Sequence, residues 1–405
     1  MKKAFTRLLS ISIIMALCVL LGGNGGAALS VKADENPKTS PATVYEANKD
    51  FNTTVAELSV WLLRESHKEK TGNTLISPVS VMTALAMAGN GARGETQSEF
   101  DGLFGQSFEK YSAQRAVSKL MSKFTNTSRV KIKSANSVWI KADFKVLPAY
   151  VKSCKSYFKA EVFNEPFDST TVEKVNSWVG KKTGGDINNM LNEMPDNSKM
   201  LLINAISFDG KWANGYKEDD IYSDIFFCLD GTESEAKFMR SEESVYLEDG
   251  KCTGFLKRYD NKYAFAAILP YEDINQYIDS LTGEELLSLM ENAKQNKITA
   301  VIPKFSLDYG IELTKPLQAV GLNNAFTYSA DFSGMTGNQD LYIGSVLHKA
   351  FINVNEKGTK AKAATAVEMR AKSEGSCVCL NRPFIFAIID TRTSLPIFLG
   401  MVERL

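Results

Sequence analysis

Apolar residues recur three and four positions apart over several stretches of the chain, mostly in its first half. This spacing puts the apolar side chains on one face of an α-helix and therefore predicts helices. The stretches that show it are 55–68, 78–90, 145–158, 171–183 and 283–293.

The second half contains short apolar runs of a different kind. YAFAAILP (263–270) and ITAVIP (298–303) each end at a proline, as buried strands often do. PFIFAIID (383–390) and LPIFLGMV (395–402) are separated only by Thr391–Ser394, which predicts a β-hairpin. Helices early in the chain, followed by strands that must pair over long distances, indicate an α+β domain around a large mixed sheet.

Residues 1–33 have the layout of an export signal. The basic residues Lys2, Lys3 and Arg7 precede an apolar stretch, Leu8–Leu21, which is shorter than a membrane-spanning helix requires. We therefore predict a signal peptide that is removed during export.

Small residues follow the apolar stretch, and cleavage after either Ala28 or Ala33 fits the pattern. Residues 34–48 are polar and contain proline, so we expect a flexible leader there. The mature protein is then expected to be secreted and extracellular, with no membrane attachment after signal removal.

The charge of the mature chain is nearly balanced. Removal of the signal takes away four basic residues and no acidic ones, which leaves 43 basic and 47 acidic residues. So small an excess gives no reason to expect nucleic acid as a partner. Five of the six cysteines remain, and an odd number in an exported chain means an unpaired thiol or an intermolecular bond. We expect a monomer held together by a hydrophobic core.

Few residues could support catalysis. The only histidines are His67, on an apparently exposed helical face, and His348, between strand-like runs. We interpret the first as solvated and the second as structural. No G-x-S-x-G motif frames a serine nucleophile. Cys377 and Cys379 lie on one side of a strand-like segment, but two histidines are too few for a convincing metal cluster. We therefore expect no enzyme, metal or cofactor.

The run from Thr359 to Glu374 contains no glycine, proline or aromatic residue and separates two strand-like stretches. Over residues 359–370, small or apolar side chains alternate with positions that carry four charges. This is the period of a half-buried strand. Alanine and lysine are poor strand formers, however, and the same residues tolerate a helix. The pattern alone leaves a strand and a charged helix open.

Eight segments match the motifs of one known family in their order and spacing. They are NTLISPVSVMTALAMAGNGARGET (73–96), ANSVWI (135–140), VNSWVGKKTGGDI (175–187), LLINAISFDGKW (201–212), IPKFSLDYGIEL (302–313), ADFSGM (330–335), LHKAFINVNEKGTKAKAATA (347–366) and NRPFIFAIID (381–390). On these motifs, residues 49–405 resemble a serpin domain. The resemblance implies three β-sheets with about nine surrounding helices and an exposed reactive-centre loop at about residues 357–380. It favours the strand over the helix for residues 359–370.

The resemblance also implies a mechanism. In an inhibitory serpin, a protease attacks the loop as a substrate, and the loop then inserts as a new strand into the protein's own large sheet while the acyl-enzyme persists. The hinge of this movement is implied for Glu356, Gly358, Thr359, Ala361, Ala363, Ala364 and Thr365. Lys362 departs from the usual alanine, but the alternation puts it on the solvent face, where its charge stays hydrated.

Family spacing places the reactive bond at Lys372–Ser373, whether it is counted from the hinge glutamate or from the proline of the Asn-x-Pro-Phe motif. Arg370–Ala371 is the alternative. A basic residue before the bond suits proteases with a carboxylate in the specificity pocket. The resemblance thus implies a covalent complex with a trypsin-like serine protease. A non-inhibitory binding protein or chaperone of the same fold is the second possibility.

Two further groups of residues are implied to control the sheet. The shutter, a hydrogen-bonded cluster beneath the strands that open, corresponds to Ser77, Pro78, Ser80, Asn204 and His348. The breach, where the loop first enters, corresponds to Trp212, Lys304 and Glu356. Asp209 departs from the family, which usually has lysine at this position.

Overall fold

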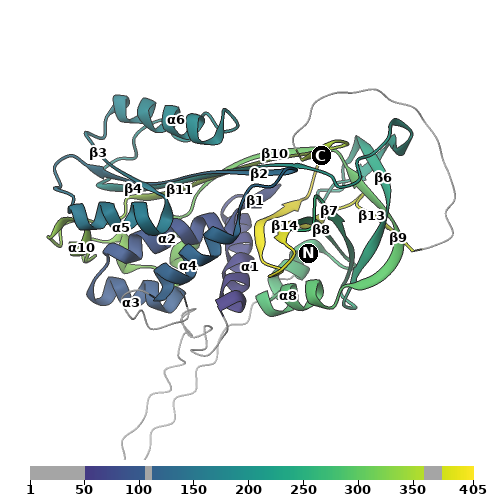
Figure 1. Ribbon diagram of the computed structural model, residues 1–405, viewed down its shortest axis with the longest axis horizontal. Coiled ribbons are helices and arrows are strands. Elements are labelled where there is room, and N and C mark those ends of the chain that lie inside the picture. Colours follow the sequence, from purple (N-terminus) through teal and green to yellow (C-terminus); the bar gives the residue numbers. More distant parts are fainter. Residues whose placement is uncertain (1–50, 105–111, 360–375) are drawn as a thin grey trace, which may run out of the picture. The chain divides into compact units, whose positions relative to one another are not determined.

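The computed structural model describes residues 51–104, 112–359 and 376–405 (Figure 1). In these ranges the α-helices are α1 (Phe51–Glu69), α2 (Pro78–Gly91), α3 (Gly94–Leu103), α4 (Ser112–Lys123), α5 (Pro148–Phe158), α6 (Ser169–Thr183), α7 (Ile274–Ser280), α8 (Gly283–Glu291), α9 (Thr314–Ala319) and α10 (Ser333–Thr336). The strands are β1 (Thr74–Ile76), β2 (Val130–Lys141), β3 (Glu161–Glu165), β4 (Met200–Lys211), β5 (Ile221–Phe227), β6 (Glu233–Glu248), β7 (Cys252–Arg258), β8 (Tyr263–Pro270), β9 (Lys294–Pro303), β10 (Phe305–Glu312), β11 (Ser345–Asn355), β12 (Gly358–Thr359), β13 (Cys377–Cys379), β14 (Phe384–Asp390) and β15 (Pro396–Val402).

The five helices predicted from the apolar spacing are confirmed as α1, α2, α5, α6 and α8. Local signals set their beginnings. Both α2 and α5 start at a proline, which has no N–H to leave unpaired there. The Asp168 carboxylate accepts hydrogen bonds from the N–H groups of Thr170 and Thr171 at the start of α6. Thr282 and Glu285 form a reciprocal capping box on α8.

The smaller sheet has six strands in the order β10-β11-β12-β4-β2-β3. Its strands β4 and β11 are parallel neighbours, with Leu201 opposite Ser345 and Ser207 opposite Phe351. Figure 1 shows β2, β4 and β11 side by side, with α6 on one face of the sheet and α2 and α5 on the other. This arrangement leaves the β4–β11 boundary in the middle of a covered sheet.

The larger sheet has nine strands in the order β1-β15-β14-β8-β7-β6-β9-β13, with β5 also paired to β6. The predicted hairpin is confirmed, because β14 and β15 are antiparallel neighbours on either side of Thr391–Ser394. Strand β6 is 16 residues long and pairs with β5 along its first part and with β7 along its last. The sheet therefore has two halves that share β6, and with the smaller sheet these halves give the three sheets expected.

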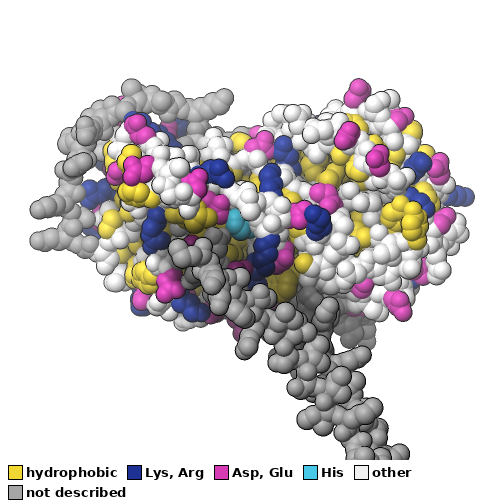
Figure 2. Space-filling model, turned by 180° about the vertical axis from the view of Figure 1, so that it is seen from behind, with side chains coloured by type: hydrophobic (Ala, Val, Ile, Leu, Met, Phe, Trp, Pro, Cys, Tyr) yellow, Lys and Arg dark blue, Asp and Glu magenta, His cyan; other side chains and the backbone are white. Residues whose placement is uncertain are grey.

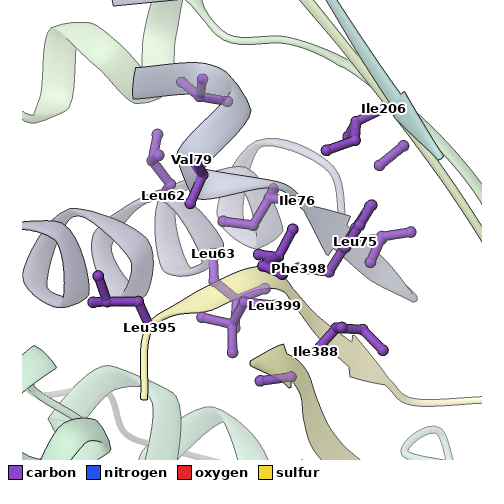
Figure 3. Packing of buried hydrophobic residues seen from close by; sticks show 14 of the residues in the cluster. Leu62, Leu63, Leu75, Ile76, Val79, Ile206, Ile388, Leu395, Phe398 and Leu399 are labelled. Carbon is purple, nitrogen blue, oxygen red and sulfur yellow. The ribbon is translucent and has the colours of Figure 1, made fainter. Parts of the chain in front are cut away.

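The main core contains residues of both sheets and of most of the described helices, and part of it lies between the larger sheet and α1 and α2. Figure 3 shows Leu75 and Ile76 of β1 beside Phe398 and Leu399 of β15, with Leu63 of α1 close by. All five side chains are fully buried. The five cysteines in the described ranges are free thiols, so burial of apolar surface rather than cross-linking stabilises this part of the fold.

A smaller aromatic cluster fastens α6 to its sheet. Trp139 of β2 stacks on Phe163 of β3 with ring centroids 4.1 Å apart. Trp178 of α6 meets both rings edge-on, at 6.2 Å and 5.5 Å. Such edge-on and stacked aromatic pairs contribute beyond their buried area, and they hold the helix over β2 and β3.

The prediction of a solvated His67 is wrong. Its side chain is only 13% exposed, and its Nε2 lies 3.2 Å from the Glu403 carboxylate. The other ring nitrogen lies 3.3 Å from the Thr74 hydroxyl. The helical pattern predicted that the end of α1 is exposed to solvent. In the structure, the residues that follow β15 cover it.

Basic and acidic side chains are interspersed over the face drawn in Figure 2, without a large patch of one sign among the described residues. This distribution agrees with the equal totals of 47 basic and 47 acidic residues in the whole chain. Among the described residues, no helix combines the length and the apolar character that a membrane span requires.

Candidate functional site

The boundary between β4 and β11 is open at one end, and β12 fills the opening. Gly358 and Thr359 form this short strand, which is antiparallel both to β11 and to β4. A side chain at Gly358 would strike the Gly210 carbonyl oxygen, since an added Cβ would lie 2.0 Å from it, and the φ of 149° also suits glycine. The absence of a side chain at Gly358 is therefore what lets the chain enter between the two strands.

The Thr359 side chain points into the core. It is 1% exposed, and its hydroxyl lies 2.6 Å from the Tyr259 hydroxyl. Thr359 is the first residue of the small, uncharged set in the alternating segment, and it occupies the buried face as that pattern predicts. The other hinge positions, Ala361, Ala363, Ala364 and Thr365, lie outside the described residues.

Beyond β12 the two strands converge. Thr359 sits between Gly210 of β4 and Val354 of β11, whereas Ser207 and Phe351 are already direct partners. A strand that continued from Thr359 would run along this boundary and separate the seven residue pairs that now join β4 to β11. The geometry is that of a sheet with one strand position partly occupied.

The predicted shutter residues meet beneath this boundary. The His348 Nε2 accepts the Ser77 backbone N–H at 3.1 Å, and the His348 Nδ1 lies 2.7 Å from the Asn204 Oδ1. The Asn204 amide nitrogen donates to Ser80 and to the Asn136 side chain. The Ser77 hydroxyl donates to the Ile397 carbonyl at 2.7 Å. The network thus joins α2, β2, β4, β11 and β15, and Pro78 is the first residue of α2.

The protonation state of His348 follows from its partners. Because Nε2 accepts the Ser77 N–H, the ring proton must be on Nδ1, where it is donated to the Asn204 oxygen. Burial lowers the pKa of His348 from 6.5 to about 3. A second proton would leave two N–H groups facing each other at Ser77, so the network requires the neutral ring.

This network makes stability depend on pH. The folded-state pKa of His348 lies below its ordinary value of 6.5, so between these two values the unfolded chain binds a proton that the folded chain does not. The contribution of the neutral His348 ring to the free energy of unfolding is fully present above pH 6.5 and is lost as the pH falls below that value. From pH 7.5 to pH 5, we expect this group to lower the free energy of unfolding by about 2 kcal/mol. Urea unfolding at the two pH values measures it. In His348→Gln the difference should shrink by that amount, and an unchanged difference would assign the acid sensitivity to other groups.

The predicted breach residues surround the turn that leads into β12. The Trp212 indole N–H donates to the Asn355 carbonyl at 2.8 Å. Lys304 and Glu356 form an ion pair at 2.8 Å, with side chains 22% and 12% exposed. Burial raises the pKa of Glu356, but the hydrogen bond and charge of Lys304 outweigh it and hold that pKa below the ordinary value. The pair holds the turn between β11 and β12.

Several residues that were not predicted from the sequence contact the predicted hinge, shutter and breach residues. Tyr259 stacks on Trp212 with ring centroids 4.5 Å apart and also contacts the Thr359 hydroxyl, so it connects the breach to the hinge. Asn136 lies in the ANSVWI motif (135–140). A polar residue in such an apolar strand could have indicated that it belongs to the shutter network. Lys131 stands directly opposite Asp209 in the β2–β4 ladder; this opposite-charge pairing accommodates the departure from the family's lysine.

A buried lysine was also missed. Lys257 is 2% exposed, and its ammonium forms an ion pair with Glu243 at 2.7 Å. It also lies 4.3 Å from the centre of the Tyr216 ring and 5.4 Å from that of Trp212. Burial lowers its pKa, and Glu243 opposes that effect. Lys257 therefore packs as a cation against Trp212, one of the predicted breach residues.

The remaining predicted positions are placed as follows. The reactive bond Lys372–Ser373 and its alternative Arg370–Ala371 lie outside the described residues, as does Lys362. Cys377 and Cys379 are on β13, at the edge of the larger sheet. Burial raises the pKa of both thiols, that of Cys379 to about 12, so neither has thiolate character at neutral pH. Within the described ranges, no three His, Cys, Asp or Glu residues are grouped to hold a metal.

A family model described as "Serpin (serine protease inhibitor)" matches residues 53–405. The chain is a serpin. A serine protease inhibitor from Cyanea capillata is 29% identical over 349 residues, which cover 82% of this chain and 92% of that protein. Members of this family are mostly protease inhibitors.

Solved serpin structures agree with this assignment. The thermophilic serpin tengpin in its native state is 40% identical, with a TM-score of 0.82 and coverage of 89% of this chain and 96% of tengpin. Against tengpin in its latent state, the TM-score is 0.77 at 38% identity, with coverage of 89% and 100%. Thyroxine-binding globulin in complex with thyroxine is 24% identical with a TM-score of 0.80 over 87% of this serpin and 98% of that chain, and that likeness concerns the fold alone.

Proposed function

We propose that this serpin inhibits trypsin-like serine proteases as a suicide substrate. The observation that carries the proposal is β12, because the first hinge residues, Gly358 and Thr359, already lie as a strand between β4 and β11. The buried side chain of Thr359 has the size and lack of charge that an inserting strand needs on its inner face. Both features favour an inhibitor over a serpin used only for binding.

The covalent step uses the protease's own chemistry. The protease serine hydroxyl attacks the Lys372 carbonyl carbon, and the bond from that carbon to the Ser373 nitrogen breaks. The proton of the hydroxyl goes to the leaving nitrogen, and Lys372 remains as an ester on the protease. The freed hinge side of the loop then extends β12 along the β4–β11 boundary, carries the attached protease with it, and deforms the geometry needed for deacylation.

Insertion can supply the driving force. Each ladder hydrogen bond contributes a net of about 0.5–1.5 kcal/mol, so a dozen new bonds contribute roughly 6–18 kcal/mol. That is comparable with or larger than the ~5–15 kcal/mol stability of an ordinary domain. The uncut form is then a kinetic trap, and the shutter and breach contacts are the barriers that keep it closed.

We also infer that this serpin acts outside the cell as a monomer, after removal of residues 1–33. Its partner would be an extracellular protease, and neither nucleic acid nor a membrane enters the mechanism. The layout of the first 33 residues supports export.

Incubation of the mature protein with trypsin tests the proposal. We expect a complex that survives SDS and has about the summed mass of the two proteins, less the released peptide. Lys372→Ala should abolish this complex, because trypsin binds a basic residue before the bond it cuts, whereas the matched Arg370→Ala should retain it. Complete cleavage without a complex would indicate a substrate-like, non-inhibitory member. Loss in Arg370→Ala but not in Lys372→Ala would move the reactive bond to Arg370–Ala371.

A further inference from the structure

A cavity of about 670 Å³ lies away from the inserting sheet boundary, where the end of α2 meets α4, α5 and α10. This volume is within the range of small-molecule sites. Its wall includes Arg93, Gln114, Lys152, Ser153 and Tyr157. None of the described residues that line it is acidic, so the wall carries two positive charges and no negative one.

Arg93 is held in place at the rim. Its guanidinium donates to the Ala92 carbonyl at 2.5 Å and lies flat against Gly334, where an added Cβ would come within 2.6 Å of it. The charge of Arg93 also acts on the nearby Asp331 carboxylate, which accepts hydrogen bonds from the Gln339 amide at 2.7 Å and the Ser333 N–H at 2.9 Å. Lys152 extends from the exposed side of α5. The two cations thus flank an opening that suits an anionic group.

Gln114, on the wall of the cavity, has an amide oxygen without a hydrogen-bond partner. The Asn90 Nδ2 donates to the Ser153 hydroxyl at 2.9 Å, and the Asn90 Oδ1 accepts from the Gln114 Nε2. The Gln114 Oε1 is buried and has no hydrogen-bond partner, and the residue as a whole is only 4% exposed. A buried polar atom without a partner is uncommon and costs about 1–3 kcal/mol. A ligand hydroxyl would satisfy it once the Gln114 side chain turns toward the cavity, a rotamer change of the kind that binding often brings. Because a hydroxyl both donates and accepts, it would do so with either end of the amide inward.

We infer that this cavity binds a small anion that also carries hydroxyl groups, of the size of a monosaccharide phosphate. The anionic group lies between Arg93 and Lys152, and a hydroxyl fills the vacant bond at Gln114. The Tyr157 ring offers an apolar face for the carbon skeleton. The site is independent of the reactive-centre loop, so it stands whether or not the serpin inhibits trypsin.

Isothermal titration of the mature protein with glucose 6-phosphate, glucose and inorganic phosphate tests the inference. We expect saturable one-to-one binding of glucose 6-phosphate, and binding of glucose and of phosphate that is weaker by about tenfold or more, since each lacks one of the two contacts. Lys152→Glu should weaken binding of glucose 6-phosphate by about tenfold or more. The matched Lys155→Glu makes the same charge change on α5 outside the cavity lining and should bind like the unaltered protein.

Gln114→Leu separates the two contacts. It should reduce binding of glucose 6-phosphate to the level of phosphate and leave binding of phosphate unchanged, and an unaltered circular dichroism spectrum and melting temperature would show that the variant is folded. Equal binding of phosphate and glucose 6-phosphate by the unaltered protein would overturn the role of Gln114. No binding of any of the three probes at millimolar concentration, or an equal loss in Lys155→Glu, would overturn the site.

Discussion

Thr359→Arg is expected to turn this serpin from an inhibitor of trypsin into a substrate. The Thr359 side chain is 1% exposed and contacts the Tyr259 hydroxyl in β12, so an arginine there would have to place an unpaired charge in the core before the strand could advance. Burying such a charge costs several kcal/mol, and each 1.4 kcal/mol slows insertion about tenfold. Deacylation would then overtake insertion, and the protease would leave with the loop cut.

The measurement is the number of inhibitor molecules consumed for each trypsin molecule inactivated. We expect it to rise by more than about tenfold in Thr359→Arg, with the SDS-stable complex replaced by cut protein. Thr359→Ser is the matched control, because it keeps the hydroxyl next to Tyr259 and adds no charge; its inhibition should remain near that of the unaltered protein. Undiminished trapping by Thr359→Arg would contradict the assignment of Thr359 to the inserting face.

The second large effect concerns heat. Cutting the loop is expected to raise the melting temperature by tens of degrees. The cut strand can separate the seven β4–β11 residue pairs and form a ladder with each strand, a gain of roughly 6–18 kcal/mol. In a domain of 150–250 residues, each kcal/mol corresponds to about 2–4 °C; the longer domain here shifts somewhat less per kcal/mol.

A protease that cuts near Lys372 without being trapped provides the cut form, and calorimetry compares it with the intact protein. Thr359→Arg is the control, because its loop can be cut but should insert poorly, so the increase should be much smaller. If the cut and intact forms of the unaltered protein melt at the same temperature, loop insertion does not provide the energy for inhibition.

Features set by neighbouring residues were predictable from the sequence. The spacing that predicted residues 55–68 as a helix corresponds to α1, and the turn at Thr391–Ser394 joins β14 to β15. Such signals act over a few residues, as a proline at a helix start or a short loop between strands does. The family motifs then indicated which distant residues form one site, and the structure brings Ser77, Asn204 and His348 together in one network.

Features set by contacts between distant segments were not predictable. The burial of His67 depends on Glu403, 336 positions later in the printed sequence, and no local pattern reports such a neighbour. Tyr259 was missed for the same reason, since its partners Trp212 and Thr359 come from distant parts of the chain. The alternation over residues 359–370 allowed both a strand and a helix, because the choice depends on whether two strands elsewhere make room.

The place of β14 and β15 has a consequence for synthesis on the ribosome. These two strands, Phe384–Asp390 and Pro396–Val402, are buried throughout and lie between β1 and β8 in the larger sheet. Until they emerge, β1 has no partner in that sheet and one edge of β8 is bare, although the 383 residues that precede Phe384 in the sequence have been made. Nascent chains of this protein must therefore remain incomplete and apolar at that edge until residues 384–402 have been made, and messages truncated before residue 384 should yield aggregates.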